Sequence, residues 1–130
     1  MRNESFFSAP QLKRGPLGGM PNTKEDFHWG KLVVSCLRSQ RETQVEAPAF
    51  VDFEVLPHFD GRPDDMFVWF ICALRTEVAP FRARLVRVTQ DLREVLLKRD
   101  FPAQAAATLK SDVTSMEDIE AGGGRFAYFR

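Results

Sequence analysis

The longest apolar run in the chain is Met66–Leu74, which contains no charged side chain. It is too short to cross a bilayer and too continuously apolar to have one face in solvent. A turn-forming stretch, residues 57–65, precedes the run, and a segment of helical periodicity follows it. We therefore predict a strand that is buried on both faces and lies at the centre of a sheet.

Two segments before this run predict further strands. Leu32–Leu37 is largely apolar with β-branched residues at its centre, and the polar residues 38–42 follow it. Phe50–Val55 alternates between apolar and acidic positions, which is typical of a strand with one face in solvent. Its predicted inner face carries Val51, Phe53 and Val55, and its outer face carries Asp52 and Glu54. Together with Met66–Leu74, these segments predict an antiparallel meander.

After residue 77 the apolar positions recur at intervals of three and four residues, which is the spacing of one face of an α-helix. They are Val78, Phe81, Leu85, Val88, Leu92, Val95 and Leu96. We predict one long amphipathic helix that ends near Arg99. We expect a second, alanine-rich helix capped by Asp100, and a third that opens with a capping box at Thr114 or, one residue later, at Ser115.

Gly122–Gly124 is predicted to end the third helix, and Arg125–Arg130 to form a terminal strand that rejoins the sheet. The predicted fold is a single α+β domain, residues 31–130, with a mainly antiparallel sheet of about four strands packed against one long amphipathic helix plus two short helices. Residues 1–30 contain many prolines and glycines, so we predict an irregular N-terminal arm there.

The 18 basic and 18 acidic side chains cancel, which excludes a strong overall field of either sign. A partner that is recognised by charge must therefore be recognised by a local patch. Cys36 and Cys72 lie in apolar runs and are too few for a disulfide framework, so we expect buried free thiols in a reducing compartment. Because the chain shows neither a secretory signal nor about 18 consecutive apolar residues, we expect a cytoplasmic protein that does not span a membrane.

The densest group of potential catalytic or metal-binding side chains is His58, Asp60, Asp64 and Asp65, in the loop before the central strand. One imidazole and three carboxylates are able to bind a divalent cation or to act as general acid and base. The same residues suit a solvated turn, which is the interpretation that we favour. The chain has no His-x-x-x-His or Cys-x-x-Cys spacing, so we predict no metal site and no cofactor. A small metal-dependent or hydrolytic enzyme centred on the His58 loop is an alternative to a non-catalytic protein.

Gly124–Phe129 resembles the aromatic strand of an RNA-recognition motif, in which ring faces stack on bases. Arg125 stands where that motif has a glycine, and packing in the core explains the alternating rings equally well. The predicted long helix adds a basic patch at Arg82, Arg84 and Arg87 that suits phosphate contacts. Single-stranded nucleic-acid binding is therefore a second alternative, which we do not favour because the chain has no net positive charge.

The function that we favour is a small non-catalytic protein-binding domain, with a stoichiometric inhibitor of the immunity or antitoxin type as one concrete form. The reasons are the small size, the scarcity of histidine and the separation of opposite charges along the chain. Acidic residues are the first candidates for contact with another protein, because nucleases that such inhibitors target carry basic active sites. They are Asp60, Asp64, Asp65, Glu117, Asp118 and Glu120. The basic patch at Arg82, Arg84 and Arg87 is the alternative surface.

Overall fold

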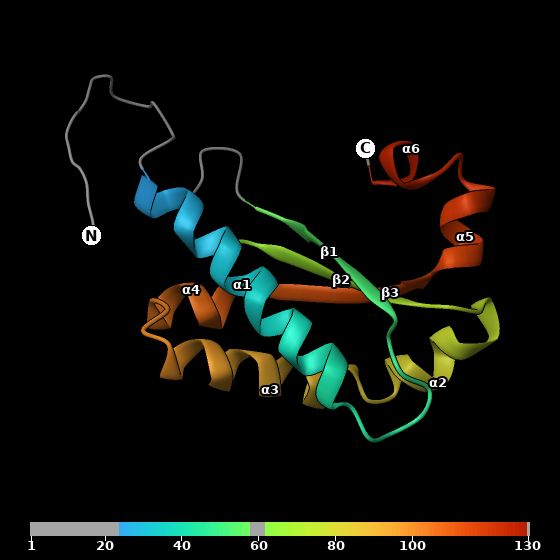
Figure 1. Cartoon of the computed structure of the whole chain (residues 1–130), viewed down its shortest axis with the longest axis horizontal. Helices are drawn as coiled ribbons and strands as arrows, with labels where there is room; N and C mark the ends of the chain where they lie inside the picture. Colours follow the sequence, from blue (N-terminus) through green and yellow to red (C-terminus); the bar gives the residue numbers. More distant parts are fainter. Residues whose placement is uncertain (1–23, 58–61, 130) are drawn as a thin grey trace.

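The sheet consists of three strands in the order β1–β2–β3 (Figure 1). β1 (Asp52–Leu56) runs antiparallel to the central β2 (Phe67–Cys72), and β3 (Lys110–Ser115) runs parallel to it. The computed structural model describes residues 24–57 and 62–129 of the chain. The α+β class and the central position of the apolar run are confirmed, and four of the six β2 residues are buried. The sheet is mixed and three-stranded, so the prediction of a mainly antiparallel sheet with a fourth strand is wrong.

α1 (Lys24–Thr43) occupies the place of the first predicted strand, Leu32–Leu37. Within that run the buried side chains are Leu32, Val33, Cys36 and Leu37, which is helical spacing. A short apolar run suits a strand or the buried face of a helix equally well, and here the helix continues on both sides of it. Residues 24–30, which we predicted as the end of the irregular arm, belong to α1, and residues 1–23 lie outside the described residues.

The predicted second strand is confirmed as β1, with the predicted division between its faces. Phe53 and Val55 pack against the core, while Asp52 and Glu54 form ion pairs on the opposite side of the strand. Val51 differs from the prediction, because it precedes β1 and is 47% exposed.

A helical crossover connects β2 to β3, as a pair of parallel strands requires. It contains the 3₁₀ turn η1 (Arg75–Glu77), α2 (Val78–Arg82), α3 (Leu85–Lys98) and α4 (Ala103–Thr108). The single long helix that we predicted is divided at Arg84, which has φ −105° and ψ 1°. Most of its apolar stripe is confirmed as the inner face, because Phe81, Val88, Leu92 and Leu96 are buried, but Val95 is 43% exposed and does not belong to it.

The two short helices that we predicted after the long one are present, as α4 and α5 (Met116–Ala121). Ser115 caps α5 by accepting a hydrogen bond of 3.0 Å from the N–H of Asp118. Asp100 does not cap α4, because it adopts a φ of 67° and Pro102 occupies the N-cap position.

The end of the chain departs most from the prediction. Residues 125–130 were predicted as a strand, but α6 (Arg125–Tyr128) is a helix, so the aromatic strand of an RNA-recognition motif is not formed. The third strand is instead β3, whose sequence Lys-Ser-Asp-Val-Thr-Ser is too polar to have indicated a strand.

Helices cover the two faces of the sheet unequally (Figure 1). The helices from α1 to α4 pack on the face where Val68 and Phe70 join the main hydrophobic core. α6 lies against the other face, where the ring of Tyr128 contacts that of Trp69 at a centroid distance of 6.4 Å. Among the helices of residues 24–57 and 62–129, none combines the length and the apolar content needed to span a membrane.

Candidate binding groove

A groove of about 290 Å³ lies between the C-terminal half of α1 and the N-terminal half of α3. Its buried apolar lining comes from Cys36, Phe50, Val88 and Leu92. Val45 also lines it and is 96% exposed. The volume is at the lower end of the range of about 300–1,000 Å³ that is usual for ligand pockets, so the groove suits one or two side chains of a peptide.

One wall of the groove contains an unsatisfied acceptor. The Nε2 of Gln40 in α1 donates a hydrogen bond of 2.9 Å to the carbonyl oxygen of Val88 in α3, which determines the orientation of the amide. The Oε1 of Gln40 is buried and accepts no hydrogen bond within the described residues. A buried acceptor without a donor costs about 1–3 kcal/mol, so the Val88 contact of this amide is made at the expense of its oxygen.

The loop after α1 closes one end of the groove. Gln44 binds the backbone of Phe50 twice: its Nε2 donates to the carbonyl oxygen at 2.8 Å, and its Oε1 accepts from the N–H at 2.9 Å. These bonds hold the loop against α1 and direct the Phe50 ring into the core, where it contacts Phe70 at a centroid distance of 4.9 Å. The loop therefore forms a fixed wall, from which Val45 projects into solvent.

The predicted basic patch is not one free surface. Arg84 and Arg87 both form ion pairs with Glu46 in the loop, and Nη1 of Arg84 donates to the Pro48 carbonyl at 2.8 Å. At 3.4 Å, the contact of Arg84 Nε with Glu46 is an ion pair rather than a formed hydrogen bond, consistent with that Nε lacking a hydrogen-bond partner. Arg82 pairs with a different acid, Asp112, at 3.2 Å. Two members of the patch thus border the groove, and the third belongs to the β3 edge.

The predicted acidic residues lie at two separate places. Asp64 and Asp65 precede β2, whereas Glu117, Asp118 and Glu120 follow β3; because β2 and β3 are parallel, the two groups lie at opposite ends of the sheet. Asp60 and His58 lie outside the described residues.

Two of the acidic residues at the β3 end already bind Arg75. Glu117 accepts a hydrogen bond of 2.6 Å from the backbone N–H of Arg75, and Asp118 forms an ion pair of 2.6 Å with its side chain. The hydrogen bonds from Arg75 and from Ser115 lower the pKa of Asp118 below its usual range. These carboxylates therefore hold η1 against α5, whereas the exposed Glu120 takes no part in this contact within the described residues.

The two cysteines are unsuited to nucleophilic chemistry. Cys36 and Cys72 are buried free thiols. Burial, together with the nearby Glu77, raises the pKa of Cys72 to about 11, and burial also raises the pKa of Cys36 against the opposing effect of Arg99. Within the described residues, no group of three or more potential metal-ligating side chains is close enough to hold an ion.

The groove was not found from the sequence because its walls are formed by segments that we interpreted differently. Residues 38–42, predicted as a loop, are the last turns of α1 and place Gln40 opposite α3. The one sequence signal was Val45, an apolar residue in a polar stretch.

A scan against protein-family models, a search of curated proteins and a search of solved structures found no match to this chain. A functional proposal therefore rests on the groove and on the charged residues around it.

Proposed function

We propose that this chain is a small non-catalytic protein-binding domain and that the groove between α1 and α3 receives an apolar side chain of its partner. The observation that carries the proposal is the groove itself, whose buried apolar lining of Phe50, Val88 and Leu92 lies beside the exposed side chain of Val45. Val45 adds exposed apolar area that the partner covers.

Three of the four charged side chains that line the groove are already paired with one another, and Asp91 is the fourth. Glu46 is shared by Arg84 and Arg87, so a charged partner would have to compete with ion pairs that already exist. Burial of apolar surface instead contributes about 25 cal/mol per Å². An amphipathic helix that lies along α1 and α3 is the recognition mode that suits a groove between two helices.

A stoichiometric inhibitor of the immunity or antitoxin type is one form of such a domain. In this proposal the acidic residues at the two ends of the sheet lie outside the groove and mainly increase the rate of association with a basic partner. We also propose a cytoplasmic location, because both cysteines are free thiols and a reducing compartment keeps them so.

Site-specific photo-crosslinking tests the proposal in the full-length chain. A benzoylphenylalanine at position 45 is expected to crosslink the partner in the native host, and mass spectrometry identifies the adduct. The matched control is position 86, because Val86 is 83% exposed on α3 but does not line the groove. Equal crosslinking from both positions would show that the groove is not the contact.

The affinity for the partner identified in this way then tests the apolar contact. Val95 lines the groove, so Val95→Glu is expected to weaken binding by about tenfold or more, whereas Val86→Glu leaves it within about twofold. If charge reversal at Asp64 and Asp65, or at Glu117 and Asp118, abolishes binding while Val95→Glu has no effect, the acidic surfaces are the true contact. Turnover of a substrate by the purified protein would contradict the non-catalytic class itself.

A further inference from the structure

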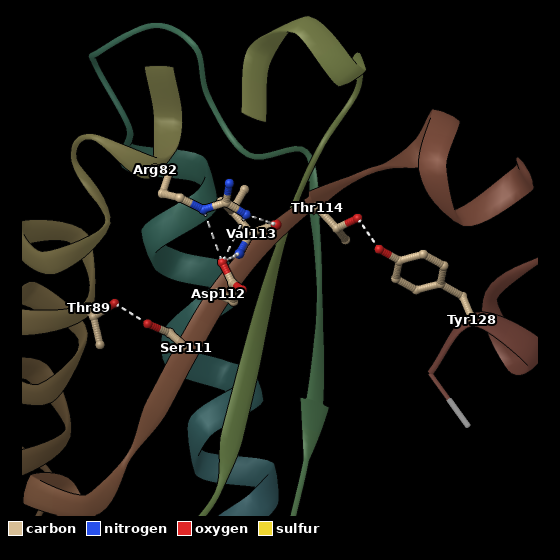
Figure 2. A network of polar contacts seen from close by, with 7 residues as sticks. All are labelled: Arg82, Thr89, Ser111, Asp112, Val113, Thr114 and Tyr128. Atoms are coloured by element: carbon tan, nitrogen blue, oxygen red, sulfur yellow. Dashed lines mark hydrogen bonds and ion pairs between the residues drawn. The ribbon is translucent and has the colours of Figure 1, made fainter. Parts of the chain in front are cut away.

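The free edge of β3 is closed by an arginine and an aspartate. An outer strand leaves some backbone N–H and C=O groups unpaired, and these groups are able to bind a strand of another chain. At β3 the N–H of Val113 donates to Oδ1 of Asp112 at 2.7 Å, and its carbonyl oxygen accepts from Nη2 of Arg82 at 3.2 Å (Figure 2). Arg82 also forms an ion pair with Asp112, so the two side chains together occupy the edge.

The free edge of β1 has the same arrangement. The N–H of Phe53 donates to Oδ1 of the preceding Asp52 at 2.8 Å, and its carbonyl oxygen accepts from Arg125. Arg125 also contacts Asp52 at 2.7 Å and Glu54 at 2.8 Å. In both outer strands, therefore, an aspartate accepts a hydrogen bond from the N–H of the residue that follows it. An arginine from a neighbouring helix binds the C=O of that same following residue and also pairs with the aspartate.

The arginine at the β3 edge is anchored in the core. It follows Phe81, which is fully buried in α2 and contacts Phe70 at a centroid distance of 5.7 Å. A second contact between the side chains of Thr89 in α3 and Ser111 in β3, at 2.7 Å, holds the same edge (Figure 2). Opening this edge would require α2 to leave the core.

The arginine at the β1 edge belongs to a helix that contributes no residue to the main core. α6 has four residues, none of them buried, and it directly follows Gly122–Gly124. The helix is held on the sheet by Arg125, by a hydrogen bond of 2.7 Å between Tyr128 and Thr114 (Figure 2), and by ring contacts with Trp69. Displacing α6 therefore uncovers Thr114 and Trp69 but leaves the main core, to which neither residue belongs, intact.

We propose that the β1 edge is a second protein-binding surface, closed by α6 in the free protein, that accepts an extended peptide segment carrying an arginine. The partner's backbone pairs with the N–H and C=O of Phe53, as in strand addition to a sheet edge. Its guanidinium takes the place of Arg125 between Asp52 and Glu54, because two carboxylates left side by side require a cation. This inference does not depend on the groove between α1 and α3.

The test uses the full-length chain and the peptide GGGRFAYFR, whose sequence is that of the chain's own residues 122–130. NMR titration of the ¹⁵N-labelled Arg125→Ala variant is expected to show binding, with shifts at residues 52–54. Wild-type protein is expected to bind at least about tenfold more weakly, because its own Arg125 occupies the site. The peptide GGGAFAYFA, in which alanine replaces both arginines, is expected not to bind the variant, whereas GGGRFAYFA, which keeps the arginine that corresponds to Arg125, is expected to bind it.

Two further variants separate this proposal from a general loss of structure. Arg82→Ala is the matched control at the other edge and is expected not to bind the probe, because α2 remains in place. Tyr128→Phe removes only the hydrogen bond to Thr114 and is expected to bind with an affinity between those of wild type and Arg125→Ala.

Equal binding by wild type and Arg125→Ala would overturn the proposal. So would equal binding of GGGRFAYFA and GGGAFAYFA, or the absence of binding to a variant that keeps a folded spectrum. If Arg125→Ala does not fold, the test rests on Tyr128→Phe. In that case the proposal is overturned if Tyr128→Phe binds the peptide no more tightly than wild type does.

Discussion

Single long side chains join segments of this protein that are far apart in the chain. Arg84 binds the backbone of Pro48, 36 positions away, and Arg125 binds Asp52, 73 positions away. Exposed ion pairs contribute only about 0–1 kcal/mol each to stability. Their main effect is geometric: Arg84 holds the loop that closes the groove, and Arg125 holds α6 on the sheet.

The cysteines give a prediction at the level of single residues. At pH 8, a pKa of about 11 makes the Cys72 thiolate about 200-fold scarcer than in the unfolded chain, and burial restricts reagent access further. We expect both thiols to react with dithionitrobenzoate at least about 100-fold more slowly in the folded protein than in denaturant. Rapid native reaction of either thiol would contradict the buried position.

The same pKa shift has a defined effect on stability. Because the folded pKa of Cys72 is raised, the stability that the protonated thiol contributes is present below about pH 8.5 and is lost as the pH rises towards 11.

At the scale of elements, α1 is stabilised by packing rather than by its intrinsic helix propensity. It contains Gly30, several β-branched residues and a polar outer face, but its inner face is part of the main core. The ring of Trp29 near its start packs edge-on against Phe101 at a centroid distance of 5.5 Å. The helix is therefore a consequence of the tertiary structure.

Two glycine substitutions, one in α1 and one just before α6, are expected to change the free energy of unfolding in opposite directions. A Cβ at Gly30 meets nothing within 4 Å, so Gly30→Ala is expected to stabilise the protein by about 0.5–1 kcal/mol. Gly124 has φ 94°, so Gly124→Ala is expected to destabilise it by about 1 kcal/mol or more, despite open space around the Cβ. Urea denaturation measures both free energies of unfolding. Destabilisation by Gly30→Ala would show that α1 is not helical at that position.

At the scale of the whole molecule, opposite charges cancel locally as well as in total. Glu46, Asp52, Glu54, Asp112 and Asp118 each form an ion pair with an arginine. Because its 18 basic and 18 acidic side chains balance, the chain has no strong overall field that would attract nucleic acid from a distance.

Acid stability tests this pairing. Burial raises the pKa of Asp52, but hydrogen bonds from Arg125 and from the Phe53 N–H outweigh this effect, so the pKa lies below its usual range. A lowered folded pKa means that the stability contributed by the pair is present above about pH 4 and is lost as the pH falls through the folded pKa. We expect the melting temperature of wild type to be nearly constant from pH 7 to 5 and to fall below about pH 4.

The variant Asp52→Asn is expected to melt at a lower temperature than wild type at pH 6. Between pH 5 and pH 3 its melting temperature is expected to fall less than that of wild type. Asp91→Asn is the control, because Asp91 is exposed and forms no ion pair in the described part of the chain. If the melting temperatures of wild type and Asp52→Asn fall equally across this range, the contacts of Arg125 with Asp52, Phe53 and Glu54, here called the Arg125 clamp, do not contribute to stability.

The sequence by itself determined the type of those elements whose characteristic pattern lies within a few consecutive residues. The apolar run around Phe70 indicates a buried strand, and the alternation around Phe53 indicates a strand with two different faces. The capping pattern predicted first at Thr114, with Ser115 as the alternative, indicates the start of α5 to within one residue, and the cap is Ser115. Each depends on the direction of neighbouring side chains or on one local hydrogen bond, so no distant residue is needed to recognise it.

The tertiary structure alone decided the other elements and both candidate surfaces. Leu32–Leu37 suits a helix or a strand, and packing against the core selects the helix. β3 is polar and becomes a strand because β2 offers it backbone partners along a parallel edge. The groove and the Arg125 clamp join residues that are dozens of positions apart. Such contacts leave no periodic pattern in the sequence, because the distances between these residues exist only after the chain has folded.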